Sequence, residues 1–209
     1  LDVEGFGSGV RLLSGSPKQL CMVEGHAGAD AAFFVGYHAK AGTANAILDH
    51  TISGLAVYSV LLNVIEVGET GLNAAACAGR KVPLALVTGD AAVCAESSAL
   101  LGESLVTACV KKGHGRMAAD CLSPTDSAKV LREAASLAVE RARQKKAPFM
   151  GIGDGSFDLR VTFHNSMQCD WASTIPGTQR IDGRTVKVCG PDMSTMMRWA
   201  LSLIFLGGR

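Results

Sequence analysis

The chain has 209 residues and a formal net charge of +1, with 20 Lys and Arg set against 19 Asp and Glu. An apolar fraction of 48% excludes intrinsic disorder, and the dispersed charges exclude a basic stripe for nucleic acid or a basic patch for a membrane. Because no uninterrupted apolar run reaches bilayer length, we expect a soluble, cytoplasmic protein with neither a nucleic-acid nor a membrane partner.

The seven cysteines favour a reducing compartment. Their number is odd, they form no C-x-x-C pair, and most stand in apolar or Ala-rich surroundings such as those of Cys77 and Cys94. This pattern predicts buried free thiols rather than disulfides or a thiolate zinc site.

The first predicted element is the end of a strand at residues 1–5. Successive side chains of a strand alternate between its faces, so Asp2 and Glu4 point the same way. Two adjacent carboxylates repel each other unless a cation lies between them, which makes this pair a candidate for metal ligands. The alternative is a solvated strand edge, which is the commoner setting for such a pattern.

Residues 33–73 carry most of the candidate chemistry. The apolar run at 33–35 predicts a buried strand, and His38 follows at its C-terminal end, which is the edge of an α/β sheet where ligands bind. His50 stands in the next loop, and Glu69 stands at the start of a helix of small residues. A single histidine after an apolar strand is more often structural. Two imidazoles accompanied by carboxylates predict a metal site or acid–base chemistry.

Strands and helices alternate through the rest of the chain. The predicted strands cover residues 33–35, 56–62, 65–67, 82–87, 104–110, 157–163 and 185–188. The predicted helices cover residues 72–78, 90–101, 125–146, 168–173 and 193–205, and Ser123-Pro124 caps the longest of them.

This order predicts an α/β fold: a Rossmann-like, mostly parallel sheet flanked by helices, with a smaller C-terminal α+β unit. A glycine-rich hinge at residues 151–155 separates a metal-binding catalytic domain, residues 1–150, from a smaller domain, residues 156–209. His114 is expected in an exposed basic turn, and His164 in a structural position or at an interface.

Several short motifs occur in order along the chain: Met22-Val23-Glu24-Gly25, Gly36-Tyr37-His38-Ala39, Asp49-His50, Gly68-Glu69-x-Gly71-Leu72-Asn73-Ala74, Thr88-Gly89-Asp90, Cys121-Leu122-Ser123-Pro124 and Pro176-Gly177-Thr178. Each is weak alone, but the ordered set resembles the zinc-dependent D-aminopeptidases of the DppA type from about Val10 to the C-terminus. The start, Asp2-Val3-Glu4-Gly5, also resembles the Asp-x-Glu-Gly start of that family.

The resemblance implies a metallo-aminopeptidase that removes an N-terminal residue, in the D configuration, from short peptides or amino-acid amides. It implies two zinc ions per subunit, with Asp2 bridging them. Glu4 and Glu69 would complete one site and His38 would bind the other ion. His50 would be the catalytic residue, as nucleophile or as general acid/base. The family also implies a ring-like homo-oligomer.

One departure from the family pattern bears on this reading. In the family the second zinc takes another histidine, from a Ser-His-Gly-like segment, whereas this chain passes directly from Gly5 to Val10. We therefore expect a missing segment between about residues 5 and 10. His26 is a minor candidate to replace the histidine of that segment. Two alternatives stay open: a non-catalytic peptide-binding or assembly protein with a degraded metal site, and a different dinuclear amide hydrolase. Asp49 and Glu24 are candidates for recognising the free amine of a substrate.

Overall fold

The computed structural model describes residues 5–153 and 155–208, so Asp2 and Glu4 lie outside the described residues. Its elements, in chain order, are η1 (Cys21–Val23), β1 (Ala32–Tyr37), β2 (Val57–Leu62), β3 (Ile65–Glu66), α1 (Glu69–Ala78), β4 (Leu84–Asp90), α2 (Ala91–Leu101), β5 (Val106–Gly115), β6 (Ala118–Cys121), α3 (Pro124–Arg143), β7 (Phe157–Phe163), α4 (Ser166–Ala172), β8 (Gln179–Arg180), β9 (Thr185–Gly190) and α5 (Met193–Gly207).

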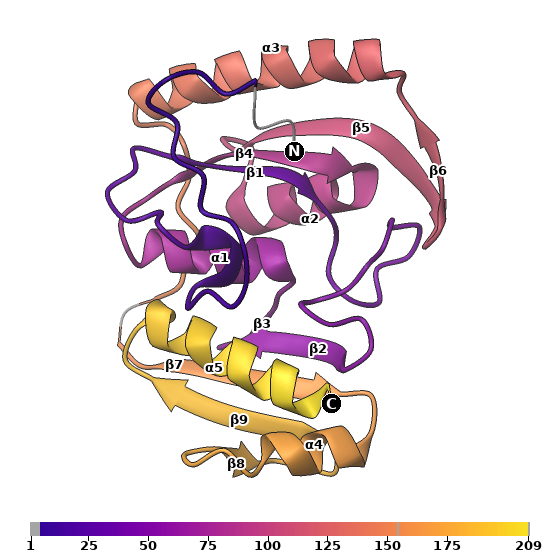
Figure 1. Cartoon of the computed structure of the whole chain (residues 1–209), viewed down its shortest axis with the longest axis vertical. Helices are drawn as coiled ribbons and strands as arrows, with labels where there is room; N and C mark the ends of the chain where they lie inside the picture. Colours follow the sequence, from indigo (N-terminus) through magenta and orange to yellow (C-terminus); the bar gives the residue numbers. More distant parts are fainter. Residues whose placement is uncertain (1–4, 154, 209) are drawn as a thin grey trace.

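The strands form two sheets, which lie one above the other in Figure 1. Sheet A has the order β1-β4-β5-β6, in which β1, β4 and β5 run parallel and β6 runs antiparallel to β5. Sheet B has the order β3-β2-β7-β9-β8 and is antiparallel throughout. The prediction of a mostly parallel sheet with a smaller α+β unit is confirmed.

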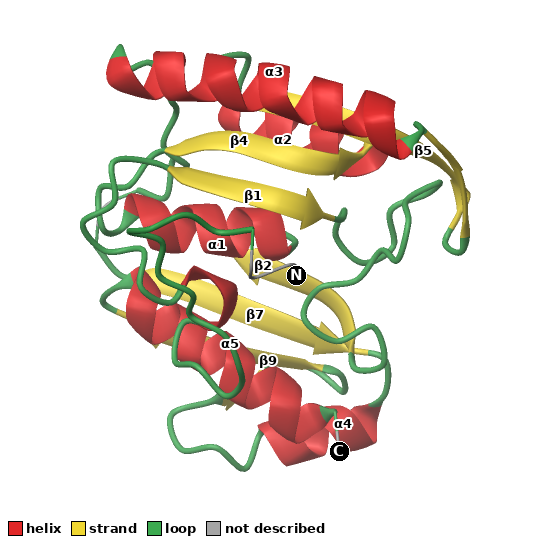
Figure 2. Ribbon diagram, turned by 45° about the horizontal axis from the view of Figure 1, so that its top comes forward, coloured by secondary structure: helices red, strands yellow, loops and turns green. Residues whose placement is uncertain are grey.

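Helices cover sheet A on both faces. Helix α3 lies on one face and α2 on the other (Figure 1), while α1 lies between the two sheets (Figure 2). Every residue of the central strand β4 is consequently buried, as expected for a parallel strand with helices above and below it. The predicted cap of α3 is present, because the Ser123 hydroxyl accepts a hydrogen bond from the Asp126 amide at 3.1 Å and Pro124 opens the helix.

Sheet B is held by packing on one of its faces. Side chains of β7 alternate between buried and half-buried, so one face of the strand is covered. Helix α5 lies against β7 and β9 and also contacts α1. Its three methionines at 193, 196 and 197 are buried, and they join a hydrophobic cluster that includes Phe163 and the apolar side of α1.

The chain division and the sheet division do not coincide. Strand β7 begins at Phe157, close to the start of the unit predicted at residues 156–209. Sheet B nevertheless takes β2 and β3 from the preceding part of the chain, because β2 pairs antiparallel with β7, with Val60 opposite Val161. The unit around sheet B is therefore larger than the C-terminal segment alone.

Two short strands, β6 and β8, are absent from the prediction. All of their residues are exposed, so they carry no apolar alternation that would mark a strand. Strand β5 runs on to Gly115, so the prediction of a turn at His114 was wrong: this residue is exposed in a strand that pairs with β6. Residues 5–20 contain no helix or strand, and within the described part of the chain β1 stands at one end of the strand order of sheet A.

The cysteine prediction is correct in part. All seven are free thiols. Cys77, Cys94 and Cys169 are buried, but Cys109, Cys121 and Cys189 are exposed. In the part of the chain that the structure describes, no helix combines the length and the apolar character needed to cross a bilayer.

Candidate metal centre

The candidate site lies where parallel strands of sheet A end. Strand β1 ends at Tyr37, and His38 is the next residue of the chain. The neighbouring strand β4 approaches very closely here, since a Cβ atom on Gly89 would lie 2.2 Å from the carbonyl oxygen of Tyr37. Only glycine permits that approach, which places His38 beside the carboxyl edge of the sheet, the usual ligand-binding edge of α/β folds.

Three predicted residues meet at this edge. Glu69 is the first residue of α1, and its Oε1 atom lies 3.4 Å from Nε2 of His38 and 3.3 Å from Nε2 of His50. The ligand atoms of the three residues all lie within 4.8 Å of one another. The sequence separates these residues by 31 positions, and the end of β1, the following loop and the start of α1 bring them together.

The outer nitrogens of both rings contact backbone carbonyls. Nδ1 of His38 lies 3.1 Å from the carbonyl oxygen of Ala39, and Nδ1 of His50 lies 2.5 Å from that of Leu48. Since a carbonyl only accepts hydrogen bonds, each neutral ring carries its proton on Nδ1 and turns the lone pair of Nε2 towards Glu69. Such carbonyl anchoring of Nδ1 is typical of metal-binding histidines.

The two imidazoles are stacked, with ring centroids 3.8 Å apart and an interplanar angle of 16°. Two positive rings in this stack would repel each other. When both rings are neutral and Glu69 is ionised, three lone-pair atoms converge, and they also repel one another unless a proton or a metal cation lies among them. Imidazole nitrogen and carboxylate oxygen are the preferred ligands of catalytic zinc, so the cluster fits that ion.

The cluster also perturbs the titration of its members. Burial disfavours the charged form of Glu69, but the hydrogen bond that His38 donates from Nε2 when its ring is protonated, together with that from the Ile52 amide at 2.8 Å, outweighs burial and lowers the pKa of Glu69 below its ordinary value. Burial likewise disfavours the imidazolium of His38, yet the Glu69 carboxylate and the Ala39 carbonyl raise the pKa of His38 above its ordinary value. The site therefore holds a negative carboxylate that attracts a proton or a metal cation.

The loop that carries His50 has no regular structure and is fixed by side chains. Asp90, which is fully buried, accepts a hydrogen bond from the Ile47 amide at 2.6 Å and also caps α2. Asp49 accepts hydrogen bonds from the Gly42 amide at 2.8 Å and from Arg116 at 2.6 Å. The contacts with Asp90 and Arg116 come from distant parts of the chain, and together with the local contact to Gly42 they hold His50 in place.

Three further candidates, His26, Asp49 and Glu24, lie outside this cluster, whereas Asp2 and Glu4 lie outside the described residues. Both ring nitrogens of His26 contact backbone carbonyls, those of Val23 and Ala76. Asp49 is paired with Arg116, and Glu24 accepts a hydrogen bond from the Leu20 amide at 2.9 Å. Neither carboxylate belongs to the cluster of His38, His50 and Glu69, and their role in recognising a free amine stays a prediction.

Asn73 and His164 contact other side chains of the fold, and a structural position was the expectation for His164. The Asn73 side chain donates to the Tyr37 hydroxyl at 3.0 Å and so ties α1 to β1. His164 follows β7 and meets the ring of Tyr58 edge-on, at a centroid distance of 6.1 Å.

Two residues near the site were not predicted from the sequence. Arg116 lies in the turn between β5 and β6 and binds Asp49, and Glu96 lies in α2 and binds the Lys40 amide. Both contacts are formed only in the folded chain.

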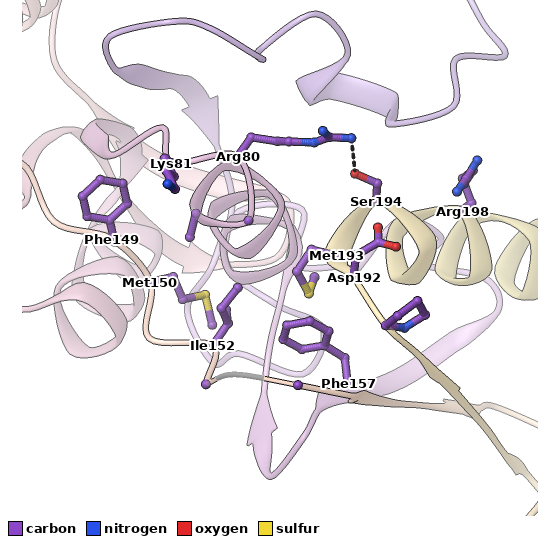
Figure 3. A pocket seen from close by; sticks show the side chains of 15 residues that line it. Arg80, Lys81, Phe149, Met150, Ile152, Phe157, Asp192, Met193, Ser194 and Arg198 are labelled. Atoms are coloured by element: carbon purple, nitrogen blue, oxygen red, sulfur yellow. Dashed lines mark hydrogen bonds between the residues drawn. The ribbon is translucent and has the colours of Figure 1, made fainter.

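Two cavities differ in their relation to the cluster. One, of about 890 Å³, lies at the end of α1, where Arg80 donates to Ser194 and Met150, Phe157 and Met193 supply apolar walls (Figure 3). Glu69 is at the opposite end of this ten-residue helix, roughly 15 Å away at 1.5 Å per residue. The cavity in Figure 3 is therefore separate from the metal centre.

A second cavity, of about 630 Å³, adjoins the cluster. Its walls include Lys40, Asp49, Tyr58 and Arg116. Lys40 follows Ala39 in the chain and Asp49 precedes His50, so the cavity lies beside the backbone segments that carry the cluster. Its charged groups are paired, with Lys40 Nζ 3.1 Å from Glu66 and Arg116 2.6 Å from Asp49.

The fold and the cluster define a class of protein: an α/β protein with a metal-binding set of imidazoles and a carboxylate at the carboxyl edge of its parallel sheet. Comparison with protein families matches residues 1–202 to the D-aminopeptidase family of peptidases. The chain belongs to this family, which confirms the resemblance seen in the sequence.

Two relatives support the assignment. The chain is 34% identical over 175 residues to the D-aminopeptidase of Bacillus subtilis (strain 168), a match that covers 83% of this chain and 62% of that protein. It also resembles the solved structure of the Zn-dependent D-aminopeptidase DppA from Bacillus subtilis, described as a self-compartmentalizing protease. That match has a TM-score of 0.91 and 32% identity, and it covers 99% of this chain and 74% of the other. The chain thus spans 62% of the length of its curated relative.

Proposed function

We propose that this protein is a zinc-dependent aminopeptidase that removes the N-terminal residue, in the D configuration, from short peptides or amino-acid amides. The observation that carries the proposal is the convergence of His38, His50 and Glu69, with both histidines anchored through Nδ1 on backbone carbonyls. Membership of the D-aminopeptidase family directs this chemistry to a peptide or amide bond next to a free amine.

In this proposal His38 and Glu69 hold zinc, together with Asp2 and Glu4 from the start of the chain, and two ions are bound per subunit. Zinc supplies a Lewis acid for the scissile carbonyl and a bound water whose pKa is lowered to about 7. Glu69 supplies the negative charge of the site, since its pKa is held below the ordinary value although it is buried.

His50 is the proposed catalytic residue. Its side chain is 29% exposed, more than the 10% of Glu69, so it faces both the cluster and the solvent. With Nδ1 held on the Leu48 carbonyl, its Nε2 atom is the one that holds or moves a proton, and the departing amine needs such a proton. The pair of Asp49 and Arg116 fixes the backbone beside it.

The cavity of about 630 Å³ receives the rest of the substrate in this proposal, and its size suits a short peptide rather than a folded protein. Assembly into a homo-oligomer is proposed because the related DppA is described as self-compartmentalizing. A cytoplasmic location is proposed because all seven cysteines are free thiols.

The test is metal analysis and turnover of the wild type beside two variants. We expect about two zinc ions per chain and hydrolysis of D-aminoacyl amides, with little hydrolysis of the L-amides. His38→Ala should lose zinc and turnover together, whereas His50→Ala should keep zinc and lose turnover. If His50→Ala loses as much zinc as His38→Ala, then His50 is a ligand and its catalytic role is wrong.

A second candidate is a peptide-binding protein without catalysis. The observation that favours it is that, across residues 5–153 and 155–208, only the three residues of the cluster lie close enough to hold a metal ion. A purified protein that holds no zinc but binds D-dipeptides would establish this second function. Rapid turnover of L-amides alone would instead indicate a different amide hydrolase.

A further inference from the structure

Glu96 is a carboxylate that the proposed reaction does not use. It lies in α2, and its side chain is directed at the junction between the segment after β1 and the start of α1. Its Oε2 atom accepts a hydrogen bond of 2.8 Å from the amide of Lys40. Its Oε1 atom is buried and has no hydrogen-bond partner among the described residues. A buried carboxylate oxygen without a hydrogen-bond partner lowers the stability of the fold, so we expect Glu96 to have a function that offsets this cost.

The amide that Glu96 holds belongs to a peptide unit with a direct role in the cluster. The N–H of Lys40 and the carbonyl of Ala39 are the two ends of one planar peptide. That carbonyl accepts from Nδ1 of His38 at 3.1 Å and from the backbone amide of His50 at 3.4 Å. Because the peptide is planar, a contact that fixes its N–H also fixes the direction of its carbonyl.

Glu96 also contacts the segment that carries Glu69. A Cβ atom on Gly68 would lie 3.0 Å from Oε1 of Glu96 and 2.8 Å from Cβ of Lys40. Gly68 is the N-cap residue of α1 and immediately precedes Glu69. The carboxylate of Glu96 therefore lies where the backbone segments beside His38 and Glu69 meet.

We propose that Glu96 is a positioning residue of the metal centre. By holding the peptide between Ala39 and Lys40, it keeps the Ala39 carbonyl on Nδ1 of His38 and so leaves Nε2 of that ring without a proton and directed at Glu69. The part of this inference that concerns zinc rests on the proposed function. The part that concerns the tautomer of His38 does not.

In this proposal the peptide between Ala39 and Lys40 is oriented by a hydrogen-bond acceptor at the end of a side chain as long as that of Glu96. Glu96→Gln keeps an acceptor oxygen at the same distance and should preserve the arrangement. Glu96→Ala removes the acceptor, and Glu96→Asp withdraws it by one methylene while keeping the charge. Glu66→Ala is the matched control, because Glu66 contacts the Lys40 side chain, at 3.1 Å, rather than its backbone amide.

The first measurement is the tautomer of His38 in metal-free protein, read from the ¹⁵N shifts of its ring at about pH 9, above the ordinary histidine pKa of about 6.5. The resonance is assigned with His38→Gln. We expect a proton on Nδ1 in the wild type, in Glu96→Gln and in Glu66→Ala. Glu96→Ala and Glu96→Asp should show a mixture of the two tautomers.

The second measurement is the zinc dissociation constant of the same variants. Loss of a group that orients a metal ligand typically weakens metal binding about 10–100-fold, and we expect this for Glu96→Ala and Glu96→Asp. Glu96→Gln and Glu66→Ala should stay within about 3-fold of the wild type, well short of that range. Should Glu96→Ala fail to fold, the comparison of Glu96→Asp with Glu96→Gln still decides the question.

Two results would overturn the proposal. One is an unchanged tautomer and zinc affinity in both Glu96→Ala and Glu96→Asp. The other is a wild-type-like Glu96→Asp beside an impaired Glu96→Gln, which would show that charge rather than the hydrogen bond matters. If the wild type binds no zinc and hydrolyses nothing, the proposed function fails, but the tautomer measurement still tests Glu96.

Discussion

The carboxyl end of sheet A and the core of sheet B differ in how many buried polar side chains they contain. Of the buried polar or charged side chains among the described residues, all except Thr185 fall between residues 51 and 97, around the end of sheet A. The core of sheet B is apolar, and its charged residues Asp158, Arg160 and Lys187 form ion pairs on the exposed side.

The difference corresponds to two roles: the end of sheet A carries the candidate reactive groups, and the core of sheet B stabilises the fold by packing. A charge that is shielded from water interacts more strongly with a proton, a metal ion or a substrate, so a reactive site gains from partial burial of Glu69. A sheet that only has to hold a domain together gains more from apolar contact. Substitutions of the cluster residues should therefore change function more than stability, and substitutions of apolar side chains under sheet B should do the reverse.

The largest expected effect is the loss of function in Glu69→Gln. The amide is isosteric but neutral, so the charge that balances a metal cation is lost. Because even groups that only support a metal ligand are worth about 10–100-fold in metal affinity, zinc binding and turnover should each fall more than about 100-fold. The unfolding midpoint of the metal-free protein should stay near the wild-type value. Glu66→Gln, three residues earlier and 45% exposed, is the control and should retain activity.

The reverse result is expected for Phe163→Ala. Phe163 is fully buried at the end of β7, where a Cβ atom on Gly207 would lie 2.5 Å from its ring. Its removal leaves a cavity between sheet B and α5 and should lower the free energy of unfolding by about 3–5 kcal/mol in denaturant titrations. Phe205→Ala, at a side chain that is 59% exposed, should change it by less than about 0.5 kcal/mol. Equal losses in the two variants would mean that sheet B is not held by its buried face.

A pair of helix caps sharpens the comparison. Asp90 and Asp192 cap α2 and α5, accepting from the amides of Val93 and Thr195 at 2.9 Å in each case. Asp90 alone also holds the loop before His50, through the Ile47 amide. Asp192→Ala should cost about 1 kcal/mol of stability without loss of kcat. Asp90→Ala should cost about 2–3 kcal/mol, because it also leaves a loop amide unpaired, and should lower kcat as well. Unchanged kcat in folded Asp90→Ala would show that the loop is fixed by other contacts.

The two regions also differ in how far the sequence predicted them. In sheet B, strand β7 was predicted with its observed bounds, because its apolar alternation is local. Its pairing with β2 was not predicted, since Val60 and Val161 are neighbours only through the fold. At the candidate metal centre, His38, His50 and Glu69 were singled out by their residue types and by the family motifs, and the structure brings the three together.

The supporting shell of the metal centre was not predictable in the same way. Glu96 and Lys40 are 56 residues apart, and the contact joins a side chain to a backbone amide, which can belong to any residue type. Arg116 and Asp49 are 67 residues apart, in segments without regular alternation. A sequence shows which groups can react, whereas the contacts that orient them depend on long-range packing.

The smallest expected effect is a difference in pH response between the two regions of the metal-free protein. At the metal centre the His38 pKa is raised above its ordinary 6.5, and the Glu69 pKa is lowered below its ordinary 4.5. The stabilisation from His38 is therefore complete below pH 6.5 and is lost as the pH rises through the higher folded pKa. The stabilisation from Glu69 is complete above pH 4.5 and is lost only as the pH falls through the lower folded pKa.

On sheet B the ion-paired carboxylate of Asp158 contributes a pH dependence of stability only in acid. Burial opposes the charge on Asp158, but Arg160 and Lys187 outweigh it and hold the Asp158 pKa below its ordinary 3.8, so this contribution is lost only in acid. Raising the pH from about 6 to about 8.5 should then reduce the free energy of unfolding of metal-free protein through His38, whose folded pKa is raised. Asp158→Asn should keep this change and His38→Gln should remove it. A slope that survives in His38→Gln would place the titrating group outside the metal centre, and the contrast between the two regions would then not extend to their pH response.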